Sequence, residues 1–167
     1  HPGLRLPGCW DAFELAVRAI LGQQVTVKGA TTLTGRLVER FGAPRADVLA
    51  DADLAGIGLP KARAESIRAF ARAVSDGQIR FDASVAAPEF VARLCELPGI
   101  GAWTANYIAM RALGDPDAFP ASDLGLLKAA GASSPRRLEQ IAEAWRPWRS
   151  YAALYLWESL RGKERAS

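Results

Sequence analysis

Apolar residues recur at every third or fourth position along most of this chain, which is the spacing of one buried face of an α-helix. No stretch alternates apolar and polar residues for long enough to require a strand. We therefore predict an all-α fold of about nine helices. The expected helices run from Trp10 to Leu21, Val27 to Phe41, Val48 to Leu54, Ile67 to near Gly77, Val85 to Leu94, Ala102 to Leu113, Asp123 to Ala130, Pro135 to Trp145 and Pro147 to Arg161.

Glycine and proline residues mark the ends of these helices. Gly42 and Pro44 end the second helix, and residues 114–116 (GDP) close the helix that ends at Leu113. Residues 56–58 (GIG) repeat the pattern of residues 99–101 (GIG), but no Leu-Pro pair precedes them. We interpret the first of these repeats as a tight turn.

The composition restricts the class of protein. A chain of 167 residues with 50% apolar residues can bury the core of one domain or of two small lobes. No segment approaches the roughly 18 uncharged apolar residues of a membrane span, so we expect no membrane partner. The net charge of +3 slightly favours a polyanionic partner, although a neutral enzyme can have the same charge.

Residues that bind transition metals are scarce. Cys9 and Cys95 lie far apart in the sequence, and His1 is the single histidine. No spacing typical of a metal site is present, so we expect no transition-metal site. So few cysteines are compatible with a reducing cytoplasm.

Residues 97–105 (LPGIGAWTA) form a short connection between two predicted helices. Pro98 cannot continue the first helix, because it lacks an amide donor and its ring blocks the preceding turn. Gly99 and Gly101 permit positive φ angles and close approach of another backbone. The next helix starts at once, so its free N–H groups suit a phosphate oxygen and would bind DNA without regard to sequence. An ordinary helix–turn–helix connection is the alternative.

Asp123 follows residues 120–122 (PAS) and starts another predicted helix. Taken alone, the local sequence favours an N-capping aspartate. The same carboxylate can stabilise the positive charge that develops on a sugar when an N-glycosidic bond breaks, and can orient the attacking water. The two roles are compatible.

Together these features resemble the helix-hairpin-helix DNA glycosylases, and most of all the bacterial alkylpurine (3-methyladenine) type. The resemblance extends from residues 13–24 (FELAVRAILGQQ) to residues 145–152 (WRPWRSYA), and its most specific part is the hairpin with its spacing to Asp123. It implies removal of damaged bases flipped out of duplex DNA. It also implies two helical lobes with a cleft between them: about residues 12–114, with the hairpin 97–101, and about residues 1–11 with 115–167.

The resemblance assigns Asp123 as the essential carboxylate of the family. It places Trp103, Tyr107 and Trp157 around the flipped base, and electron-rich rings suit the cationic ring of an alkylated purine. Core packing is the alternative role of each ring. The remaining tryptophans are expected in the core: Trp10, Trp145 and Trp148.

On the DNA side, Gln23 and Gln24 fall where the family fills the gap left by the flipped nucleotide. Some relatives have Leu at the position of Gln24, so an amide there would replace apolar wedging by hydrogen bonds to the orphan base. A polar helix end is the alternative. The hairpin residues expected at the DNA backbone are Pro98, Gly99, Ile100, Gly101, Ala102 and Thr104. The backbone carbonyls expected to hold a monovalent cation, Na⁺ or K⁺, are those of Cys95, Leu97 and Ile100.

Three absences refine the comparison. The lyase branch of the superfamily has a Schiff-base lysine where Trp103 stands, so we expect simple hydrolysis. Branches with an iron–sulfur cluster need four cysteines, so we expect no cluster. The usual N-terminal α/β domain is absent before Trp10, so we expect the catalytic portion of a larger protein. Leu124 stands where some relatives have Tyr, which leaves details of the pocket open.

We therefore predict a monofunctional DNA glycosylase that hydrolyses the N-glycosidic bond of alkylated purines and needs no cofactor. The expected partner is double-stranded DNA with damaged bases, bound by a monomer in the bacterial cytoplasm. A glycosylase for oxidised or mismatched bases is one alternative. A non-catalytic hairpin module that only positions DNA is the other.

Overall fold

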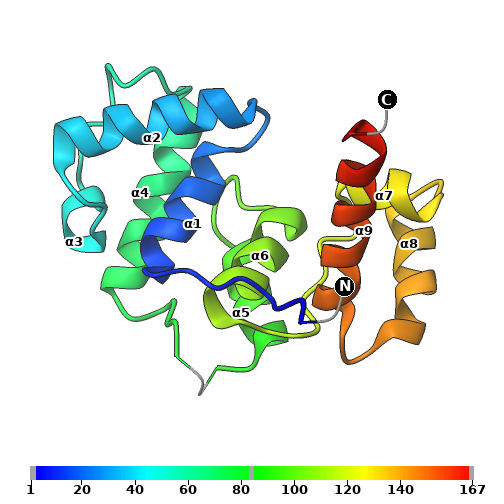
Figure 1. The fold of residues 1–167 in the computed structure, drawn as a ribbon. Helices are drawn as coiled ribbons and strands as arrows, with labels where there is room; N and C mark the ends of the chain where they lie inside the picture. Colours follow the sequence, from blue (N-terminus) through cyan, green and yellow to red (C-terminus); the bar gives the residue numbers. More distant parts are fainter. Residues whose placement is uncertain (1–2, 83–84, 166–167) are drawn as a thin grey trace.

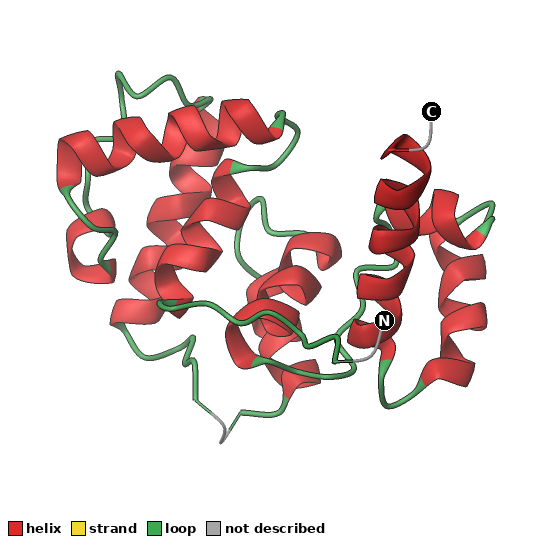
Figure 2. Ribbon diagram, viewed as in Figure 1, coloured by secondary structure: helices red, strands yellow, loops and turns green. Residues whose placement is uncertain are grey.

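The computed structural model describes residues 3–82 and 85–165, with side chains described as far as Leu160. Every element within these residues is helical (Figure 2), which confirms the predicted all-α fold. No described helix has the length and apolar character needed to cross a bilayer. The elements are α1 (Ala12–Leu21), α2 (Val27–Phe41), α3 (Ala46–Leu49), α4 (Lys61–Ser75), α5 (Ala87–Cys95), α6 (Ala102–Ile108), the π-helix η1 (Ala109–Leu113), α7 (Leu124–Ala130), α8 (Pro135–Ala142), the 3-10 helix η2 (Glu143–Trp145) and α9 (Arg149–Arg165).

The helices form two groups (Figure 1). We call the group from α1 to η1 the hairpin lobe and the group from α7 to α9 the carboxyl-terminal lobe. A connector, residues 114–123, joins the two lobes and ends at Asp123. The chain before α1 is tied to the hairpin lobe, because Arg111 Nε donates a hydrogen bond of 2.7 Å to the carbonyl of Pro7.

A chain of aromatic rings runs through the core of the hairpin lobe. Phe13 stacks on Phe70 with ring centroids 5.3 Å apart, and Phe70 meets the edge of Phe81. Phe81 in turn contacts Phe90, so one chain of rings joins α1, α4 and α5. Burying such large apolar side chains is the main driving force that holds the three helices together.

The carboxyl-terminal lobe has a smaller core in which Leu126, Leu138 and Ala153 are fully buried. The connector packs against this core, because the ring of Phe119 meets the edge of Trp145 at 6.1 Å. The position of the connector is therefore set mainly by the second lobe.

Hydrogen bonds and ion pairs also fix the connector. Asn106 Oδ1 accepts from the amide of Phe119, and Ser150, which is fully buried, contacts the carbonyls of Asp115 and Ala118. Asp117 accepts two hydrogen bonds of 2.8 Å from the guanidinium of Arg149, at the start of α9.

The charge state of Asp117 reflects these contacts. Burial raises the pKa of its carboxyl, but the hydrogen bonds and charge of Arg149, together with the charge of Arg146, outweigh burial and hold the pKa below its ordinary value. The charged form of Asp117 is thus the form that holds the connector on α9.

Local capping explains several helix starts. Each N-cap side chain accepts a hydrogen bond from the amide three residues later, which satisfies one of the free N–H groups of the first turn. Pro135 follows its cap directly, at the first helical position that tolerates proline. The capping residues are Asp11 on α1, Thr26 on α2, Asp123 on α7 and Ser134 on α8.

Some predicted helix bounds were wrong. The helix expected from Val48 to Leu54 is α3, which ends at Leu49. Asp53 accepts from the amide of Ala55 and so forms a turn that competes with a helix. The single helix expected from Ala102 to Leu113 changes to a π-helix at Ala109.

Two tryptophans predicted in the core lie outside it. Trp10 is 105% exposed, because α1 starts only after its cap, Asp11, and the ring does not join the buried face. Trp148 is 58% exposed and only meets the edge of Tyr151. The predicted turn at residues 56–58 is confirmed, with Ile57 buried between two glycines of positive φ.

Candidate active site

Three N–H donors from different parts of the chain hold the carboxylate of Asp123. Its Oδ1 accepts from the amide of Leu126 at 2.9 Å, which is the cap of α7, and from Trp157 Nε1 at 2.9 Å. Its Oδ2 accepts from Trp103 Nε1 at 2.9 Å. These contacts come from α6, α7 and α9, so both lobes fix the position of one negative group.

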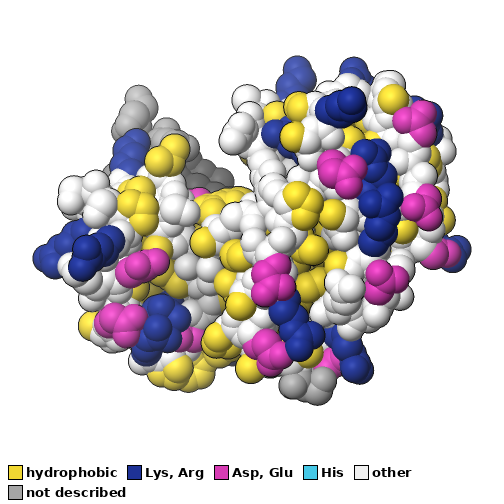
Figure 3. Space-filling view, turned by 180° about the vertical axis from the view of Figure 1, so that it is seen from behind, with side chains coloured by type: hydrophobic (Ala, Val, Ile, Leu, Met, Phe, Trp, Pro, Cys, Tyr) yellow, Lys and Arg dark blue, Asp and Glu magenta, His cyan; other side chains and the backbone are white. Residues whose placement is uncertain are grey.

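The partly buried carboxylate lies in a cleft of about 510 Å³. From behind, the surface of the molecule is notched between the two lobes, and hydrophobic side chains lie at the floor of the notch (Figure 3). The residues that line the cleft are Gly22, Gln23, Gln24, Gly99, Gly101, Trp103, Thr104, Ser122, Asp123, Leu124 and Gly125. The cleft thus brings together Asp123, the hairpin and the loop after α1.

Trp103 stacks on Tyr107, with ring centroids 5.3 Å apart and planes 4° apart. Arg111 continues this column, because its Cζ lies 5.7 Å from the centroid of Tyr107 and its Nη1 donates to the tyrosine hydroxyl at 3.3 Å. Residues four apart sit on successive turns of one face, and the wider turn of the π-helix η1 keeps Arg111 over the ring.

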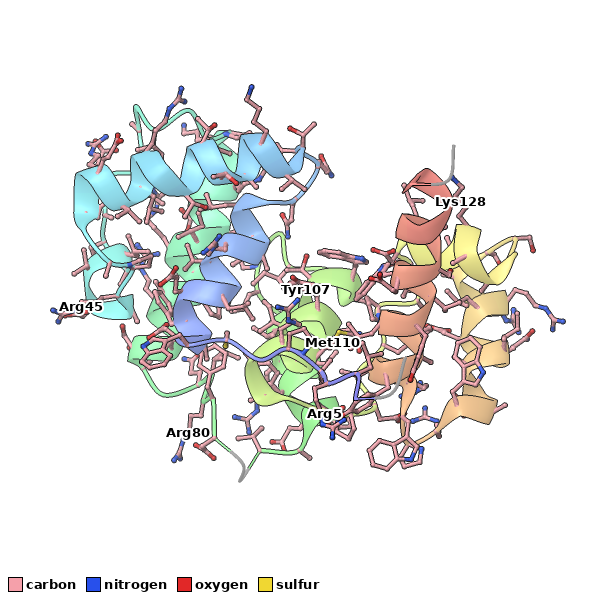
Figure 4. The ribbon with its side chains drawn as sticks, viewed as in Figure 1. Arg5, Arg45, Arg80, Tyr107, Met110 and Lys128 are labelled. Carbon is pink, nitrogen blue, oxygen red and sulfur yellow. The ribbon has the colours of Figure 1, made fainter. Side chains whose placement is uncertain are left out.

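Tyr107 lines a cavity in addition to contacting Trp103 and Arg111. Figure 4 shows Tyr107 near the centre of the molecule, where it and Trp103 also line a second cavity of about 600 Å³. The ring of Tyr107 thus contacts Trp103 by stacking, and its ring and hydroxyl both contact Arg111. Contact between Tyr107 and a flipped base, which the sequence suggested, stays a prediction.

Trp157 reaches Asp123 from α9, and Gly125 keeps space between them. A Cβ at Gly125 would lie 3.0 Å from Asp123 Oδ1 and 3.4 Å from Trp157 Cδ1. A side chain at position 125 would therefore press on the carboxylate and the indole together.

The hairpin has the conformation that its sequence suggests at Gly99. Its φ is +76°, and a Cβ would lie only 2.1 Å from the buried Oγ of Ser66 on α4. Gly99 therefore serves both the turn and a close approach to α4. At Gly101 the expected positive φ was not found: the angle is −91° and nothing lies within 4 Å of an added Cβ.

The N-terminus of α6 opens toward solvent at this hairpin. The first backbone hydrogen bond of the helix runs from Ala105 to Gly101, so the amides of residues 102–104 have no acceptor within the helix. Pro98, Gly99, Gly101 and Ala102 are exposed, whereas Ile100 and Thr104 are buried and anchor the turn. The tip of the hairpin thus exposes its backbone, and the buried side chains of Ile100 and Thr104 hold the tip in place.

Gln23 and Gln24 have different environments. Gln23 Nε2 donates to the carbonyl of Gly99 at 3.0 Å and to Thr104 Oγ1 at 3.0 Å. The expectation that Gln23 fills the gap left by a flipped nucleotide stays a prediction. Gln24 is exposed and has a φ of 55°, which is rare for a residue other than glycine.

Sequence reasoning missed two residues of this region, Arg111 and Gly125. Arg111 was recognisable from its spacing of four after Tyr107 and eight after Trp103, but the π-turn that aligns it was not. Leu124, beside Asp123, is 81% exposed in the cleft. Gly125 carried no local signal, since its role depends on α9.

A scan of protein families agrees with this geometry. The model described as "HhH-GPD superfamily base excision DNA repair protein" matches residues 17–150. The chain belongs to the HhH-GPD superfamily. Members of this superfamily that are similar to the chain include proteins described as a DNA-3-methyladenine glycosylase and a DNA-3-methyladenine glycosidase.

Two curated relatives cover most of the chain. It is 45% identical to the probable bifunctional transcriptional activator/DNA repair enzyme AlkA of Mycobacterium tuberculosis, over 95% of this chain and 36% of that protein. It is 39% identical to DNA-3-methyladenine glycosylase 2 of Escherichia coli, over 94% of this chain and 61% of that protein. The chain thus spans between about a third and three-fifths of these superfamily members.

A solved structure of the superfamily has the same fold. The DNA-3-methyladenine glycosidase of Bacillus halodurans superposes with a TM-score of 0.82 and 28% identity, over 93% of this chain and 78% of that one. The two-lobed helical arrangement is therefore that of this superfamily.

Proposed function

We propose that this chain is a DNA glycosylase that hydrolyses the N-glycosidic bond of alkylated purines flipped out of duplex DNA. One observation carries the proposal: a carboxylate held by two indole N–H groups lies in the same cleft as a backbone-exposing hairpin. Two of the named relatives, described as a DNA-3-methyladenine glycosylase and a DNA-3-methyladenine glycosidase, support the same activity.

Asp123 would act on the deoxyribose. When the bond between C1′ and the base nitrogen breaks, its electron pair leaves with the base and positive charge develops on the sugar. A fixed negative group stabilises this charge without having to reorganise. A water molecule then adds to C1′ and gives up its proton, for which the carboxylate is the acceptor.

An alkylated purine suits this site because its charge already favours departure. The base is cationic before cleavage and leaves as a neutral molecule, so the enzyme needs little help at the leaving group. Aromatic edges and the open face of Trp103 provide a permissive surface for such rings. A neutral, undamaged purine leaves less readily, which would protect normal DNA.

The residues around the cleft support hydrolysis without lyase activity. No lysine is among the described residues that line it, and Trp103 occupies the position at which the lyase branch carries its amine. Without an amine, no Schiff base traps the sugar, and the product is an abasic site. Borohydride treatment during the reaction should therefore give no covalent adduct.

The hairpin would hold the DNA backbone. Free amides at the start of α6 suit a phosphate oxygen, and their positions do not depend on the base sequence. The carbonyls of Cys95, Leu97 and Ile100 would hold Na⁺ or K⁺ beneath this tip, since neutral oxygens suit such hard cations. The carbonyl of Leu97 already accepts from Ile100, which keeps the turn compact. One chain supplies all of these groups, in keeping with a monomer acting where bacterial DNA lies, in the cytoplasm.

The decisive experiment measures release of methylated purines from duplex DNA that carries radiolabelled methyl groups. Asp123→Asn should lower the rate of release by about 10²-fold or more, because Asn keeps the cap but removes the charge. Asp76→Asn, an exposed residue at the end of α4, makes the same change of net charge outside the cleft and should leave the rate unchanged.

Each other result has a defined meaning. No release by the unaltered protein would favour a non-catalytic DNA-binding module. Equal release by the unaltered protein and Asp123→Asn would remove Asp123 from the mechanism. Release of oxidised or mismatched bases in preference to methylated purines would replace the proposed substrate class.

A further inference from the structure

Gln23 joins two segments that are far apart in the sequence. Its side-chain amide donates both of its hydrogens to the hairpin, one to the carbonyl of Gly99 and one to the hydroxyl of Thr104, each at 3.0 Å. These partners lie 76 and 81 residues further along the chain. Because an amide nitrogen has only two hydrogens, it has none left for DNA.

The hairpin is therefore held from two sides. On one side, Gly99 packs against Ser66 of α4 so closely that no Cβ fits. On the other side, the side-chain amide of Gln23 donates to the carbonyl of Gly99 and to the hydroxyl of Thr104 in the first turn of α6. Thr104 is 4% exposed, so its hydroxyl is a fixed acceptor. Removing the side chain of Gln23 would remove the hydrogen bonds that hold the hairpin on this side.

The neighbour of Gln23 is the residue that stands free at the rim of the cleft. Gln24 is exposed and has a φ of 55°, a conformation that L side chains adopt only when the surroundings impose it. The backbone before Gln24 is fixed by two contacts of Gln23. The backbone amide of Gln23 donates to the carbonyl of Ile20 at the end of α1, and its side chain donates to the hairpin. These contacts set where the side chain of Gln24 projects.

We infer that Gln23 is a positioning residue that sets the distance and orientation between the DNA-gripping hairpin and the gap-filling Gln24. The inference rests on the proposed function. A strand held at the hairpin and displaced at Gln24 delivers its flipped nucleotide to Asp123 only if the two contact points are correctly spaced. A positional error of about 1 Å at a reacting centre can cost about 10²-fold in rate.

The test combines Gln23→Met, which keeps the length but removes the donors, with Thr104→Val, which keeps the shape but removes the acceptor. Under single-turnover conditions with methylated duplex DNA, we expect Gln23→Met to lower the rate by about 10-fold, since coupled residues commonly interact by about 2- to 100-fold. Thr104→Val should lower it less, and the double variant should be no slower than Gln23→Met by more than about 2-fold. Thr104→Ser should recover most of the loss seen with Thr104→Val.

A direct DNA contact by Gln23 would give a different pattern. In that case the effects of Gln23→Met and Thr104→Val would multiply, and the loss in Gln23→Met would change with the base placed opposite the lesion. Either result would overturn the inference. Gln24→Ala provides the comparison, because its loss should depend on the opposite base.

A second measurement needs no activity. Amide hydrogen exchange of the free protein should be faster in Gln23→Met than in the unaltered chain at Ile100 and Ala105, whose backbone amides donate to the carbonyls of Leu97 and Gly101. Unchanged exchange at both amides would refute the role of Gln23 in holding the hairpin. If the unaltered protein released no base but the hairpin amides still exchanged faster in Gln23→Met, the glycosylase proposal would fail while the structural role of Gln23 stood.

Discussion

Trp103 Nε1 lies 2.9 Å from Oδ2 of Asp123, so an indole of the hairpin lobe holds a carboxylate at the start of the carboxyl-terminal lobe. The ring of the same tryptophan stacks on Tyr107 and cannot turn away without breaking that contact. Trp103 thus links the part of the molecule that would grip DNA with the part that would act on the sugar.

This link predicts the behaviour of Trp103→Phe, which keeps an aromatic ring but removes the donor. A hydrogen bond to a charged group contributes about 1.5–3 kcal/mol, so we expect the rate of base release to fall by about 10- to 100-fold. Single-turnover release from methylated duplex DNA measures the effect. Trp148→Phe, at an exposed ring outside the cleft, is the control and should match the unaltered protein. An undiminished rate in Trp103→Phe would show that this hydrogen bond does not matter for catalysis.

The space at Gly125 leads to a second prediction. Gly125→Ala places a Cβ 3.0 Å from Asp123 Oδ1, so the carboxylate must shift and the rate should fall by about 10-fold. Gly35→Ala on α2, where nothing lies within 4 Å, should instead raise the free energy of unfolding by about 0.5–1 kcal/mol and leave the rate unchanged. If Gly125→Ala were as active as Gly35→Ala, the close contact would have no catalytic consequence.

The two hairpin glycines should respond differently to alanine. Gly99→Ala combines a positive φ with a Cβ 2.1 Å from Ser66 Oγ, so we expect a loss of at least about 2 kcal/mol in the free energy of unfolding. Gly101→Ala has an ordinary φ and open space, so its stability should change by less than about 0.5 kcal/mol.

DNA affinity separates the structural role of Gly99 from the binding role of the tip. Gly101→Ala adds a methyl group at the exposed tip, so it should weaken binding to undamaged duplex DNA by several-fold even though the protein remains folded. Thermal unfolding and a binding titration at fixed salt give the two quantities. Unchanged affinity in Gly101→Ala would place the DNA backbone elsewhere.

The pKa of Asp117 predicts that the free energy of unfolding depends on pH. A carboxyl whose pKa is lowered in the folded state stabilises the protein above the unfolded pKa of about 3.9, and this contribution disappears as the pH falls through the folded value. Asp117→Asn should therefore lower the free energy of unfolding by about 1–3 kcal/mol at pH 7. The difference from the unaltered chain should shrink below about pH 4.

Urea unfolding at a series of pH values checks this prediction. Asp47→Asn is the matched control, because a hydrogen bond from Arg45 also lowers the pKa of Asp47, but this carboxyl is exposed and its pair is screened by water. The urea concentration at the unfolding midpoint of Asp47→Asn should be close to that of the unaltered chain. A gap between Asp117→Asn and the unaltered chain that stayed constant down to pH 2 would contradict the assigned role of the charge.

Gln24 is expected to combine strain with function. Gln24→Gly should be more stable than Gln24→Ala by about 1 kcal/mol, because only glycine adopts a φ of 55° without cost. Both variants should lose base flipping, measured by the fluorescence of 2-aminopurine placed beside the lesion. Full flipping in either variant would mean that another side chain fills the gap.

What the sequence determined by itself was local. Helical periodicity, capping residues and the Pro-Gly turn act within a few positions, so the all-α fold, the hairpin and Asp123 as the cap of α7 were predictable from 167 letters. The predicted helix bounds were wrong where a competing contact intervened, as at the end of α3. The predicted burial of Trp10 was wrong because Asp11 caps α1, so Trp10 lies before the start of the helix.

Only the tertiary structure decided how these parts work together. Two of the three donors to Asp123 come from residues 20 positions before it and 34 after it. The partners of Gln23 lie more than 70 positions away. No local pattern encodes such pairings, because they depend on how two lobes pack around a connector. The same distance explains why the hydrogen bonds between Gln23 and the hairpin could not be predicted from the sequence.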